Sequence, residues 1–369
     1  MIRVFSSKAG VEELEHVRQS IENQWLGGGP KLKQFEDSMA SDLSTQYFTM
    51  IDNATNGLFL ACQLLGLEPG SEIICPSFTW VGCAHAIKLA GFEPVFCDVA
   101  IESQNVSVET IKPKITRKTS AIMVVHYAGL SVDMNPIIEL GYPIIEDAAH
   151  AVCSTYKGRR CGTLGKIGVF SFDSMKNLAV GEGGGIAFSS EEHFERAKKL
   201  RLCGLGKSSY EMRGNKDRWW ELGAREASLK FKPSDISAGV ALGQLAKLPV
   251  LQQRRKEVWT RYHLELANIN ELHLPIEKEF DNSQHSYFTY TIRTPKRDQL
   301  ANFLLSEDIY TTLRFFPIHL NEVYMNGLML ENTEILKETA LNIPLHPNME
   351  EQEVDKVISS IKKFFDTAN

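Results

Sequence analysis

Short apolar runs alternate with helical patterns between about residues 47 and 190. The runs predict strands at 47–51, 72–75, 94–97, 121–125, 143–145 and 167–172, and helical periodicity fills 57–65 and 81–89. Near-continuously apolar strands that alternate with helices indicate an α/β fold with a mostly parallel central sheet covered by helices. Ligands of such sheets bind beyond the carboxyl ends of the strands. The residues at these ends are Asn53, Pro76, Asp98, His126, Asp147 and Phe172.

The pattern changes after residue 230. Helical periodicity over 234–248 and 257–266 is followed by a strand at 287–292, a helix at 298–305, a strand at 310–314 and a last helix near 350–366. Ser234 is suited to cap the first of these helices. Nearer the N-terminus, the pattern predicts one helix, 11–23, and a turn at 26–30. A chain of 369 residues is long for one hydrophobic core. We therefore expect an N-terminal helix and a large α/β domain over 1–240, and a smaller C-terminal α+β domain over 241–369.

Composition and charge narrow the class of protein. The net charge of −6 and the lack of a basic stripe argue against a nucleic-acid binder. Seven scattered cysteines form no Cys-x-x-Cys pair, and the histidines form no His-Glu-x-x-His motif, so we expect no metal site and reduced thiols. No apolar stretch has the length of a membrane span or of a signal-peptide core. These features predict a cytoplasmic protein without a membrane partner.

Lys176 has the most informative setting in the chain. It stands five residues after Ser171, between the apolar run 167–172 and the glycine-rich turn 181–185. Asp147 ends another apolar run, 29 residues before the lysine. Pyridoxal phosphate needs a lysine that forms its Schiff base and a carboxylate that pairs with its pyridinium nitrogen. Alone, Lys176 could be a surface lysine and Asp147 a helix N-cap, but their common position at the sheet end favours the cofactor.

Other residues near the same sheet end suit the rest of the cofactor. The segment 53–57 follows a strand and opens a helix, so its amides and the helix dipole suit a phosphate dianion, although it could equally be a capped turn. Ser171 is a second phosphate candidate. Trp80 could stack on the pyridine ring or belong to the core. His150 could hydrogen-bond the cofactor's phenolate oxygen, although a lone histidine is usually structural.

In combination, these segments resemble the DegT/DnrJ/EryC1/StrS family, the fold-type I aminotransferases that act on nucleotide-linked keto sugars. The resemblance covers nearly the whole chain. Its segments are, in order, Trp25-Leu26 with Gly29-Pro30, Glu68-Pro69-Gly70-Ser71-Glu72, Pro76-Ser77-Phe78-Thr79-Trp80, Glu146-Asp147-Ala148-Ala149-His150-Ala151, Tyr156-Lys157-Gly158-Arg159-Arg160-Cys161-Gly162, the lysine segment, Ser234-Asp235-Ile236 with Gly243-Gln244-Leu245, and Ile343-Pro344-Leu345-His346-Pro347. Each segment is modest alone, and their order makes the set specific.

The resemblance implies the pyridoxal-phosphate-transferase fold and pyridoxal 5'-phosphate as cofactor, with pyridoxamine phosphate as its aminated form. It implies Lys176 as the Schiff-base lysine, Asp147 as the partner of the pyridine nitrogen and Trp80 as the stacking aromatic. The phosphate would be held by Ser171, Ala54 and Thr55. His150 occupies a place that is often glutamine in the family, and both side chains can donate a hydrogen bond to the ring oxygen.

Two further residues are implied as ligand contacts. Lys230 stands where an asparagine of the neighbouring subunit often reaches the phosphate. Together with the polar, aromatic-rich stretch 217–221, it predicts a homodimer with shared active sites. A flexible lid over the chain's own site is the alternative for 206–230. Arg314 lies where the family contacts its substrate and suits a diphosphate or a glutamate carboxylate. A salt-bridged surface arginine is the alternative there.

The resemblance therefore implies a transaminase that converts a C-3 or C-4 keto group of a nucleotide-diphosphate-linked deoxysugar into an amine. L-glutamate would be the amino donor, and the product would serve surface polysaccharide (O-antigen) or glycoside biosynthesis. A transaminase of a cyclitol or an antibiotic precursor is the main alternative. A pyridoxamine-dependent sugar dehydratase of the family would carry histidine in place of Lys176. A non-enzymatic regulator built on the same fold is a further alternative, and it would be expected to carry an appended DNA-binding domain. The sequence leaves the carbon, the nucleotide and the stereochemistry open.

Overall fold

A seven-stranded sheet forms the centre of the computed structural model, which describes residues 1–205 and 223–367. Its strand order is β1-β9-β8-β5-β4-β2-β3. The strands are β1 (Tyr47–Ile51), β2 (Glu72–Pro76), β3 (Glu93–Cys97), β4 (Thr119–Val125), β5 (Ile144–Asp147), β8 (Ile167–Ser171) and β9 (Gly184–Phe188). β9 runs opposite to the other strands of this sheet and pairs antiparallel with β1 and β8, and the remaining pairs are parallel. The predicted mostly parallel α/β fold is therefore confirmed.

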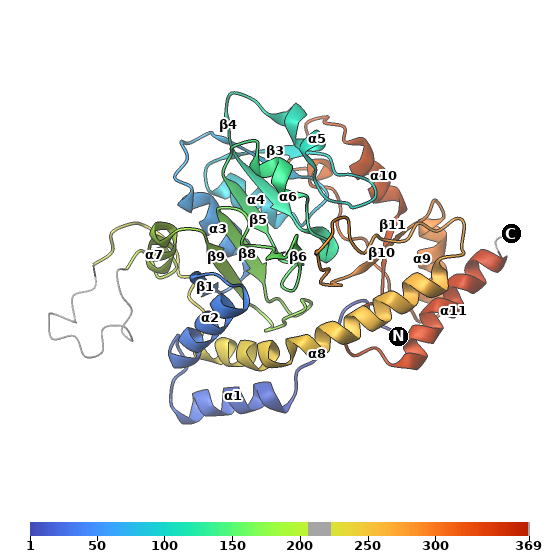
Figure 1. Ribbon diagram of the computed structural model, residues 1–369, viewed down its shortest axis with the longest axis horizontal. Helices are drawn as coiled ribbons and strands as arrows, with labels where there is room; N and C mark the ends of the chain where they lie inside the picture. Colours follow the sequence, from blue (N-terminus) through green and yellow to red (C-terminus); the bar gives the residue numbers. More distant parts are fainter. Residues whose placement is uncertain (206–222, 368–369) are drawn as a thin grey trace.

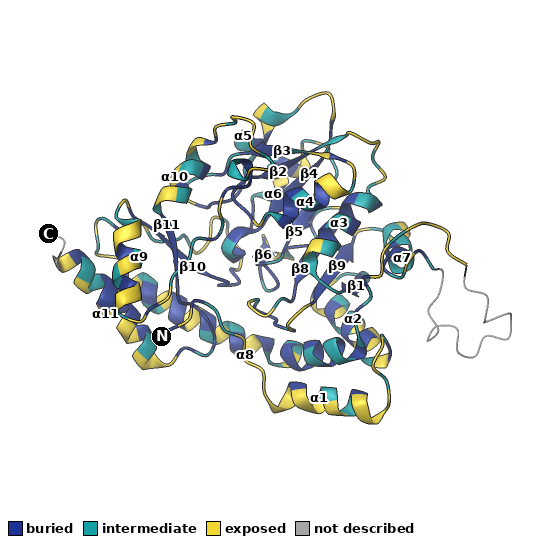
Figure 2. Ribbon diagram, turned by 180° about the vertical axis from the view of Figure 1, so that it is seen from behind, coloured by how far each residue is buried: buried dark blue, intermediate teal, exposed yellow. Residues whose placement is uncertain are grey.

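Helices cover both faces of the sheet because successive strand residues point to opposite sides. Ile122 and Val124 of β4 belong to one buried cluster, together with residues of α2 (Pro30–Asp42) and α8 (Asp235–Leu266). Ala121 and Met123 belong to the other cluster, together with α3 (Ala54–Leu64), α4 (Gly82–Leu89) and α7 (Glu191–Leu200). The buried sheet lies between helices whose outer sides are exposed (Figure 2).

A third apolar cluster belongs to the C-terminal part of the chain. It is built from the second half of α8, β10 (Tyr290–Arg293), α9 (Arg297–Ser306), β11 (Ala340–Ile343) and α11 (Glu351–Thr367), and Ile2 joins it from the other end of the chain. β10 and β11 pair as an antiparallel ribbon. α8 runs from α1 (Val11–Glu22) and α2 to α9 and α11 (Figure 1). The domain boundary expected at residue 240 falls inside α8. That boundary stays a prediction.

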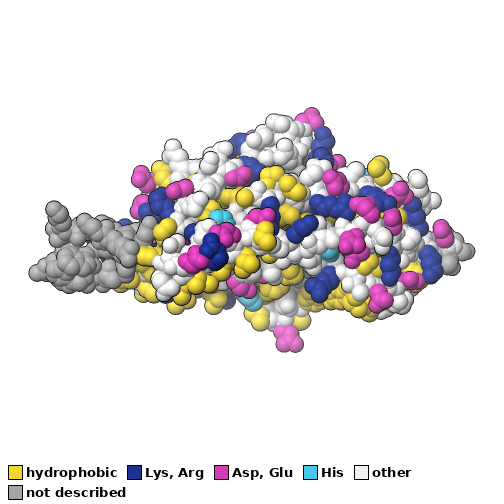
Figure 3. All heavy atoms as spheres, turned by 90° about the horizontal axis from the view of Figure 1, so that it is seen from below, with side chains coloured by type: hydrophobic (Ala, Val, Ile, Leu, Met, Phe, Trp, Pro, Cys, Tyr) yellow, Lys and Arg dark blue, Asp and Glu magenta, His cyan; other side chains and the backbone are white. Residues whose placement is uncertain are grey.

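Short elements complete the described chain: α5 (Val108–Ile111), η1 (Lys112–Lys114), η2 (Tyr127–Gly129), α6 (Met134–Ile138), β6 (Thr155–Tyr156), β7 (Arg159–Arg160), η3 (Ile318–Leu320) and α10 (Glu331–Thr339). Among the described residues, no helix has both the length and the apolar character that crossing a membrane requires. On the face seen from the side of α1 and α8, positive and negative side chains are intermixed (Figure 3).

The structure corrects several predicted elements. The two helices predicted at 234–248 and 257–266 are one helix, α8, which contains Pro249. The strand predicted at 310–314 is wrong, because Thr312 makes only an isolated bridge to Asn342. The predicted strand 287–292 is shifted to β10. The turn predicted at 181–185 ends earlier, because Gly184 already begins β9.

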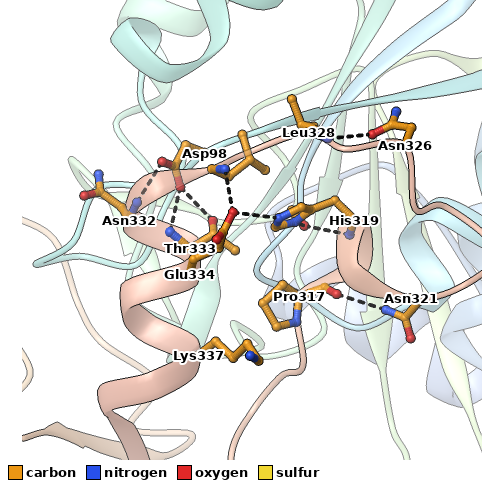
Figure 4. Close-up of polar contacts among 12 residues, drawn as sticks. Asp98, Pro317, His319, Asn321, Asn326, Leu328, Asn332, Thr333, Glu334 and Lys337 are labelled. Carbon is orange, nitrogen blue, oxygen red and sulfur yellow. Dashed lines mark hydrogen bonds and ion pairs between the residues drawn. The ribbon is translucent and has the colours of Figure 1, made fainter. Parts of the chain in front are cut away.

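Polar side chains at the ends of β2 and β3 fix the segment from Pro317 to α10 (Figure 4). The carboxylate of Asp98 accepts hydrogen bonds from the backbone N–H groups of Asn332 and Thr333, each at 2.9 Å, and from Oγ1 of Thr333 at 2.7 Å. Oγ of Ser77 lies 2.6 Å from Nδ1 of His319 and accepts a hydrogen bond from the backbone N–H of His319 at 3.1 Å. These contacts hold the chain that follows Arg314 against the carboxyl edge of the sheet.

Candidate active site

A cavity of about 530 Å³ opens at the carboxyl ends of β1, β2, β5 and β8. All the predicted site residues except Lys230 line it. Its wall contains Asn53, Ala54, Thr55, Thr79, Trp80, Asp147, Ala149, His150, Ser171, Asp173, Met175, Lys176, Arg314 and Phe315, with Phe5 from the N-terminal segment. The parallel strands thus bring together side chains that are far apart in sequence.

Lys176 lies in the turn after β8. Its backbone N–H donates to the carbonyl oxygen of Asp173 at 2.9 Å, and the N–H of Ser174 donates to that of Gly181 at 2.9 Å, which closes the turn. Burial, and then the positive charge of Arg314, lower the pKa of Lys176 to about 7. The amine is therefore partly unprotonated near neutral pH, as a nucleophile or base requires.

Asp147 is the last residue of β5 and is buried. Its Oδ1 accepts the backbone N–H of Ala149 at 2.9 Å, and its Oδ2 accepts a hydrogen bond from Sγ of Cys83 at 3.2 Å. No helix follows Asp147, so the alternative of a helix N-cap is wrong. These two contacts fix the carboxylate in the cavity wall.

The preceding residue, Glu146, faces the opposite side of β5. Its carboxylate is fully buried and accepts backbone N–H groups of Gly162 and Leu164 at 2.8 and 2.7 Å. It also contacts Nε2 of His126 at 2.9 Å. This buried network holds the end of β5 in place, because each buried polar atom keeps a partner.

The N-terminus of α3 points a set of backbone amides toward the cavity. Asn53 caps the helix by accepting the N–H of Asn56 at 2.9 Å, and Ala54 and Thr55 follow in the cavity wall. A Cβ on Gly184 would lie 2.8 Å from the backbone nitrogen of Ala54, so glycine is required for β9 to approach the helix end this closely. Ser171 ends β8 beside them. This corner suits a phosphate.

Aromatic side chains line the rest of the cavity. The indole of Trp80 is 53% exposed, so the alternative of a core tryptophan is wrong. The ring centroids of Trp80 and Phe315 lie 5.7 Å apart. His150 is buried and stacks on Phe288, with ring centroids 4.1 Å apart. Burial, followed by the charges of Lys176 and Arg314, holds the pKa of His150 well below its usual range. Its Nδ1 is buried without a hydrogen-bond partner among the described residues.

Arg314 is 6% exposed, and in the described part of the chain it forms no salt bridge, although the charge of Asp173 acts on it. The alternative of a salt-bridged surface arginine is therefore wrong. Burial lowers its pKa to about 10, so it remains a cation at neutral pH. Its guanidinium lies on the rings of Phe5 and Phe288. The site residues predicted from the sequence do not include these two rings or Phe315. The alternation of apolar residues at 2 and 4 and the strand-like run 287–292 were the available signals.

Lys230 is exposed and lies outside the cavity of its own chain. It makes an isolated bridge to Leu202. The predicted interface stretch 217–221 lies outside the described residues, so the shared site stays a prediction. A search of the described residues found no group of three or more histidine, cysteine or acidic side chains that could hold a metal ion.

The sequence model of the DegT/DnrJ/EryC1/StrS aminotransferase family matches residues 7–362. The chain belongs to this family. It is 32% identical to the dTDP-4-dehydro-2,3,6-trideoxy-D-glucose 4-aminotransferase of Saccharopolyspora spinosa, over 98% of this chain and 96% of that protein. The resemblance on which the predicted fold and activity rested is thereby confirmed, and the chain is an aminotransferase.

Solved structures of aminotransferases share the fold over the full length. The structure is similar to that of TlmJ from Streptoalloteichus hindustanus, with a TM-score of 0.94, 36% identity and complete coverage of both chains. It is also similar to Spr1654 of Streptococcus pneumoniae, with a TM-score of 0.94 and 25% identity over both whole chains in the pyridoxamine-phosphate form. A pyridoxal-phosphate form of that protein matches as well, with a TM-score of 0.91.

Proposed function

We propose that this aminotransferase uses pyridoxal phosphate to transfer the amino group of L-glutamate to the keto carbon of a nucleotide-diphosphate-linked deoxysugar. One observation carries the proposal: Lys176, Asp147 and the N-terminus of α3 line a single cavity at the carboxyl edge of the sheet. These are the three features that a pyridine ring with a phosphate arm requires.

The residues present fit this cofactor. Asp147 offers a buried carboxylate to the pyridinium nitrogen, and the amides at Ala54 and Thr55 with Ser171 offer donors to the phosphate. Trp80 presents an exposed indole to one side of the ring. The unpartnered Nδ1 of His150 can exchange a hydrogen bond with the ring oxygen. When bound, the cofactor supplies an electron sink for the carbanion of the amino acid.

The side chains of this chain supply the proton transfers. Nζ of Lys176, unprotonated in part at neutral pH, takes the proton from Cα of glutamate in the first half-reaction. In the second half-reaction it returns a proton to the sugar carbon that receives the amine. Asp147 keeps the ring nitrogen protonated. The pKa of His150 is held well below its usual range, so this imidazole is neutral and adds no positive charge beside Lys176 and Arg314.

The names of the relatives support a sugar as the acceptor. The Saccharopolyspora spinosa relative is a 4-aminotransferase of a dTDP-linked keto sugar. A second relative, 30% identical over 96% of this chain, is the spore coat polysaccharide biosynthesis protein SpsC of Bacillus subtilis. They favour amination of an activated sugar for a surface polysaccharide or a glycoside.

A substrate panel tests this proposal. The purified enzyme with pyridoxal phosphate and L-glutamate is given nucleotide sugars with a keto group at C-3 or at C-4, and a keto-cyclitol without a nucleotide. We expect kcat/KM for one nucleotide sugar to exceed that for the cyclitol by about a hundredfold or more, because the diphosphate adds charged hydrogen bonds. NMR of the product then gives the aminated carbon. A preference for the cyclitol would overturn the nucleotide-sugar assignment.

A further inference from the structure

Residues 2–7, the N-terminal strap, lie along the C-terminal part of the chain. The N–H of Ile2 donates to the carbonyl oxygen of Asp308 at 2.7 Å, and the N–H of Tyr310 donates to that of Ile2 at 3.0 Å. Farther along, the N–H of Leu345 donates to the carbonyl oxygen of Val4 at 3.2 Å. The strap is therefore fixed by backbone hydrogen bonds on both sides.

The strap places one aromatic ring in the wall of the active-site cavity. Ile2 and Val4 are buried, at 6% and 2% exposure, and Ile2 belongs to the C-terminal apolar cluster. The chain bends at Val4, and the next side chain, Phe5, lines the cavity.

Phe5 forms one side of an aromatic clamp on Arg314. The guanidinium carbon lies 3.7 Å from the centroid of the Phe5 ring and 4.9 Å from that of Phe288. The two rings are nearly parallel, with an interplanar angle of 15° and centroids 6.0 Å apart. Rings in such positions attract a cation and restrict the plane of its N–H fork.

The guanidinium has little else within the chain to satisfy its charge. Among the described residues, its side-chain hydrogen bond is to Sδ of Met175 at 3.5 Å, and the carboxylate of Asp173 in the same cavity wall favours its charge without forming a salt bridge with it. A buried cation without a directly paired carboxylate is costly. An anionic group of a ligand in the cavity would remove that cost and would accept two N–H groups of the fork together.

The position of Arg314 relative to Lys176 indicates which anion binds. Nζ of Lys176 lies 4.8 Å from the same Phe288 ring, so the two cations flank one aromatic surface. The carboxylate of an amino-acid donor is bonded to the carbon whose proton Lys176 takes. The diphosphate of a sugar nucleotide is attached at C-1, so further ring atoms separate it from a keto carbon at C-3 or C-4. With both side chains beside one ring, a carboxylate bonded directly to the reacting carbon is favoured over that diphosphate.

We propose that Phe5 is a positioning residue, which clamps Arg314 against Phe288 so that the guanidinium receives a carboxylate of the amino donor. The identity of the donor rests on the function proposed above. Phe5 does not touch the reacting atoms, and acts on donor affinity through Arg314.

The test measures binding of glutarate, a five-carbon dicarboxylate that has no amino group and cannot react, to the enzyme that carries its cofactor. Isothermal titration calorimetry should show that Phe5→Leu raises the Kd of glutarate about tenfold, and that Phe5→Tyr stays within about twofold of wild type. In turnover, Phe5→Leu should raise KM for L-glutamate by a similar factor, with kcat and the KM for the sugar little changed. Glutarate binding needs no sugar, so it can be read even if the sugar assignment fails.

A double-mutant cycle separates positioning from general structure. In an Arg314→Gln background, Phe5→Leu should have no further effect on glutarate binding. Phe316→Leu, an exposed phenylalanine outside the cavity, is the matched control and should bind as wild type does. If Phe5→Leu fails to fold, Phe5→Met replaces it in the same comparison. The proposal is overturned if glutarate binding is unchanged, if the effect persists without Arg314, or if the KM for the sugar rises in place of that for glutamate.

Discussion

Two cations and one aromatic ring set the chemistry of the cavity at the scale of single residues. Lys176 and Arg314 both lie on the ring of Phe288, at 4.8 and 4.9 Å from its centroid. Burial removes water that would solvate the ammonium, and the nearby guanidinium makes protonation of the lysine harder still. The amine is thereby matched to base catalysis near neutral pH.

The amine of Lys176 should become reactive near neutral pH. Only the unprotonated form reacts, so its rate of reductive methylation in the cofactor-free enzyme should rise with pH and reach half its maximum at about pH 7. Arg314→Gln removes a neighbouring positive charge and should move this midpoint upward. Peptide mass spectrometry measures the rate, with the other lysines of the same digest as reference. A midpoint near the ordinary lysine value of about 10.4 would contradict this account.

Trp80 should contribute to cofactor binding without contributing much to folding. Stacking on an aromatic ring is worth about 0.5–1.5 kcal/mol, so Trp80→Leu should weaken pyridoxal phosphate binding about threefold to tenfold. Trp80→Phe should lose less, because it keeps a ring. Absorbance titration of the cofactor-free enzyme measures the affinity, and urea unfolding should change little because the side chain is half exposed. Equal affinity of wild type and Trp80→Leu would remove Trp80 from the cofactor site.

The site residues that could be predicted from the sequence are those at the ends of strands. Lys176, Asp147 and Ser171 follow apolar runs, and parallel strands bring such positions to one edge. The apolar residues at 2 and 4 and the run 287–292 marked the segments of Phe5 and Phe288, but they did not indicate the contact of these rings with Arg314. Their approach to Arg314 depends on how the C-terminal part packs, which no local pattern records.

At the scale of elements, apolar runs predicted most strands of the sheet, but they missed its antiparallel strand and the continuity of α8. β9 begins with Gly184 and Gly185, which resemble a turn in sequence although they are buried between β1 and β8. The helical periodicity left a gap at 249–256, yet α8 continues through Pro249, and both of its halves pack against apolar clusters. A proline costs one helical hydrogen bond, and burial of a long helix outweighs that cost.

Asp98 should stabilise the link between β3 and α10. The helix begins after Leu330, which cannot cap it, and the carboxylate of Asp98 accepts the N–H groups of Asn332 and Thr333 instead. Asp98→Ala should lower the free energy of unfolding by about 2 kcal/mol, since it removes charged hydrogen bonds at a helix N-terminus. Urea unfolding followed by circular dichroism measures the change.

Asp37→Ala is the matched control for this variant. Asp37 is exposed and pairs with Lys33 one helical turn away, so its removal should cost no more than about 0.5 kcal/mol. Equal stability of the Asp98 and Asp37 variants would show that the contacts of Asp98 with α10 do not contribute to folding.

At the scale of the whole molecule, the cavity lies between the sheet and the C-terminal part, with the N-terminal strap as one wall. We propose that a second copy of the chain completes it. A dianionic phosphate needs more donors than Ser171 and one helix end supply. Lys230 is exposed and lies outside its own cavity, so it is free to reach that of a partner in a twofold homodimer.

Mixing two inactive variants tests the shared site. Lys176→Ala and Lys230→Ala each disable a residue of one site, and in a mixed dimer one site would combine both intact residues. After subunit exchange, we expect about a quarter of wild-type activity, because half of the dimers are mixed and each has one working site. Self-mixing of each parent is the control. If subunit exchange is verified and both parent variants are defective, a mixture that regains no activity would contradict the shared site. It would favour the alternative of a lid over the chain's own site.

Transfer of labelled nitrogen tests the central claim most directly, namely that Lys176 serves a sugar aminotransferase. Wild type and Lys176→Ala are incubated with ¹⁵N-glutamate, pyridoxal phosphate and the preferred nucleotide keto sugar in large excess over enzyme, and the product is examined by ¹H–¹⁵N NMR. The account predicts ¹⁵N on the former keto carbon with wild type through many turnovers, and none beyond background with Lys176→Ala. Sustained transfer by Lys176→Ala, or no labelled sugar from wild type across the panel, would contradict it.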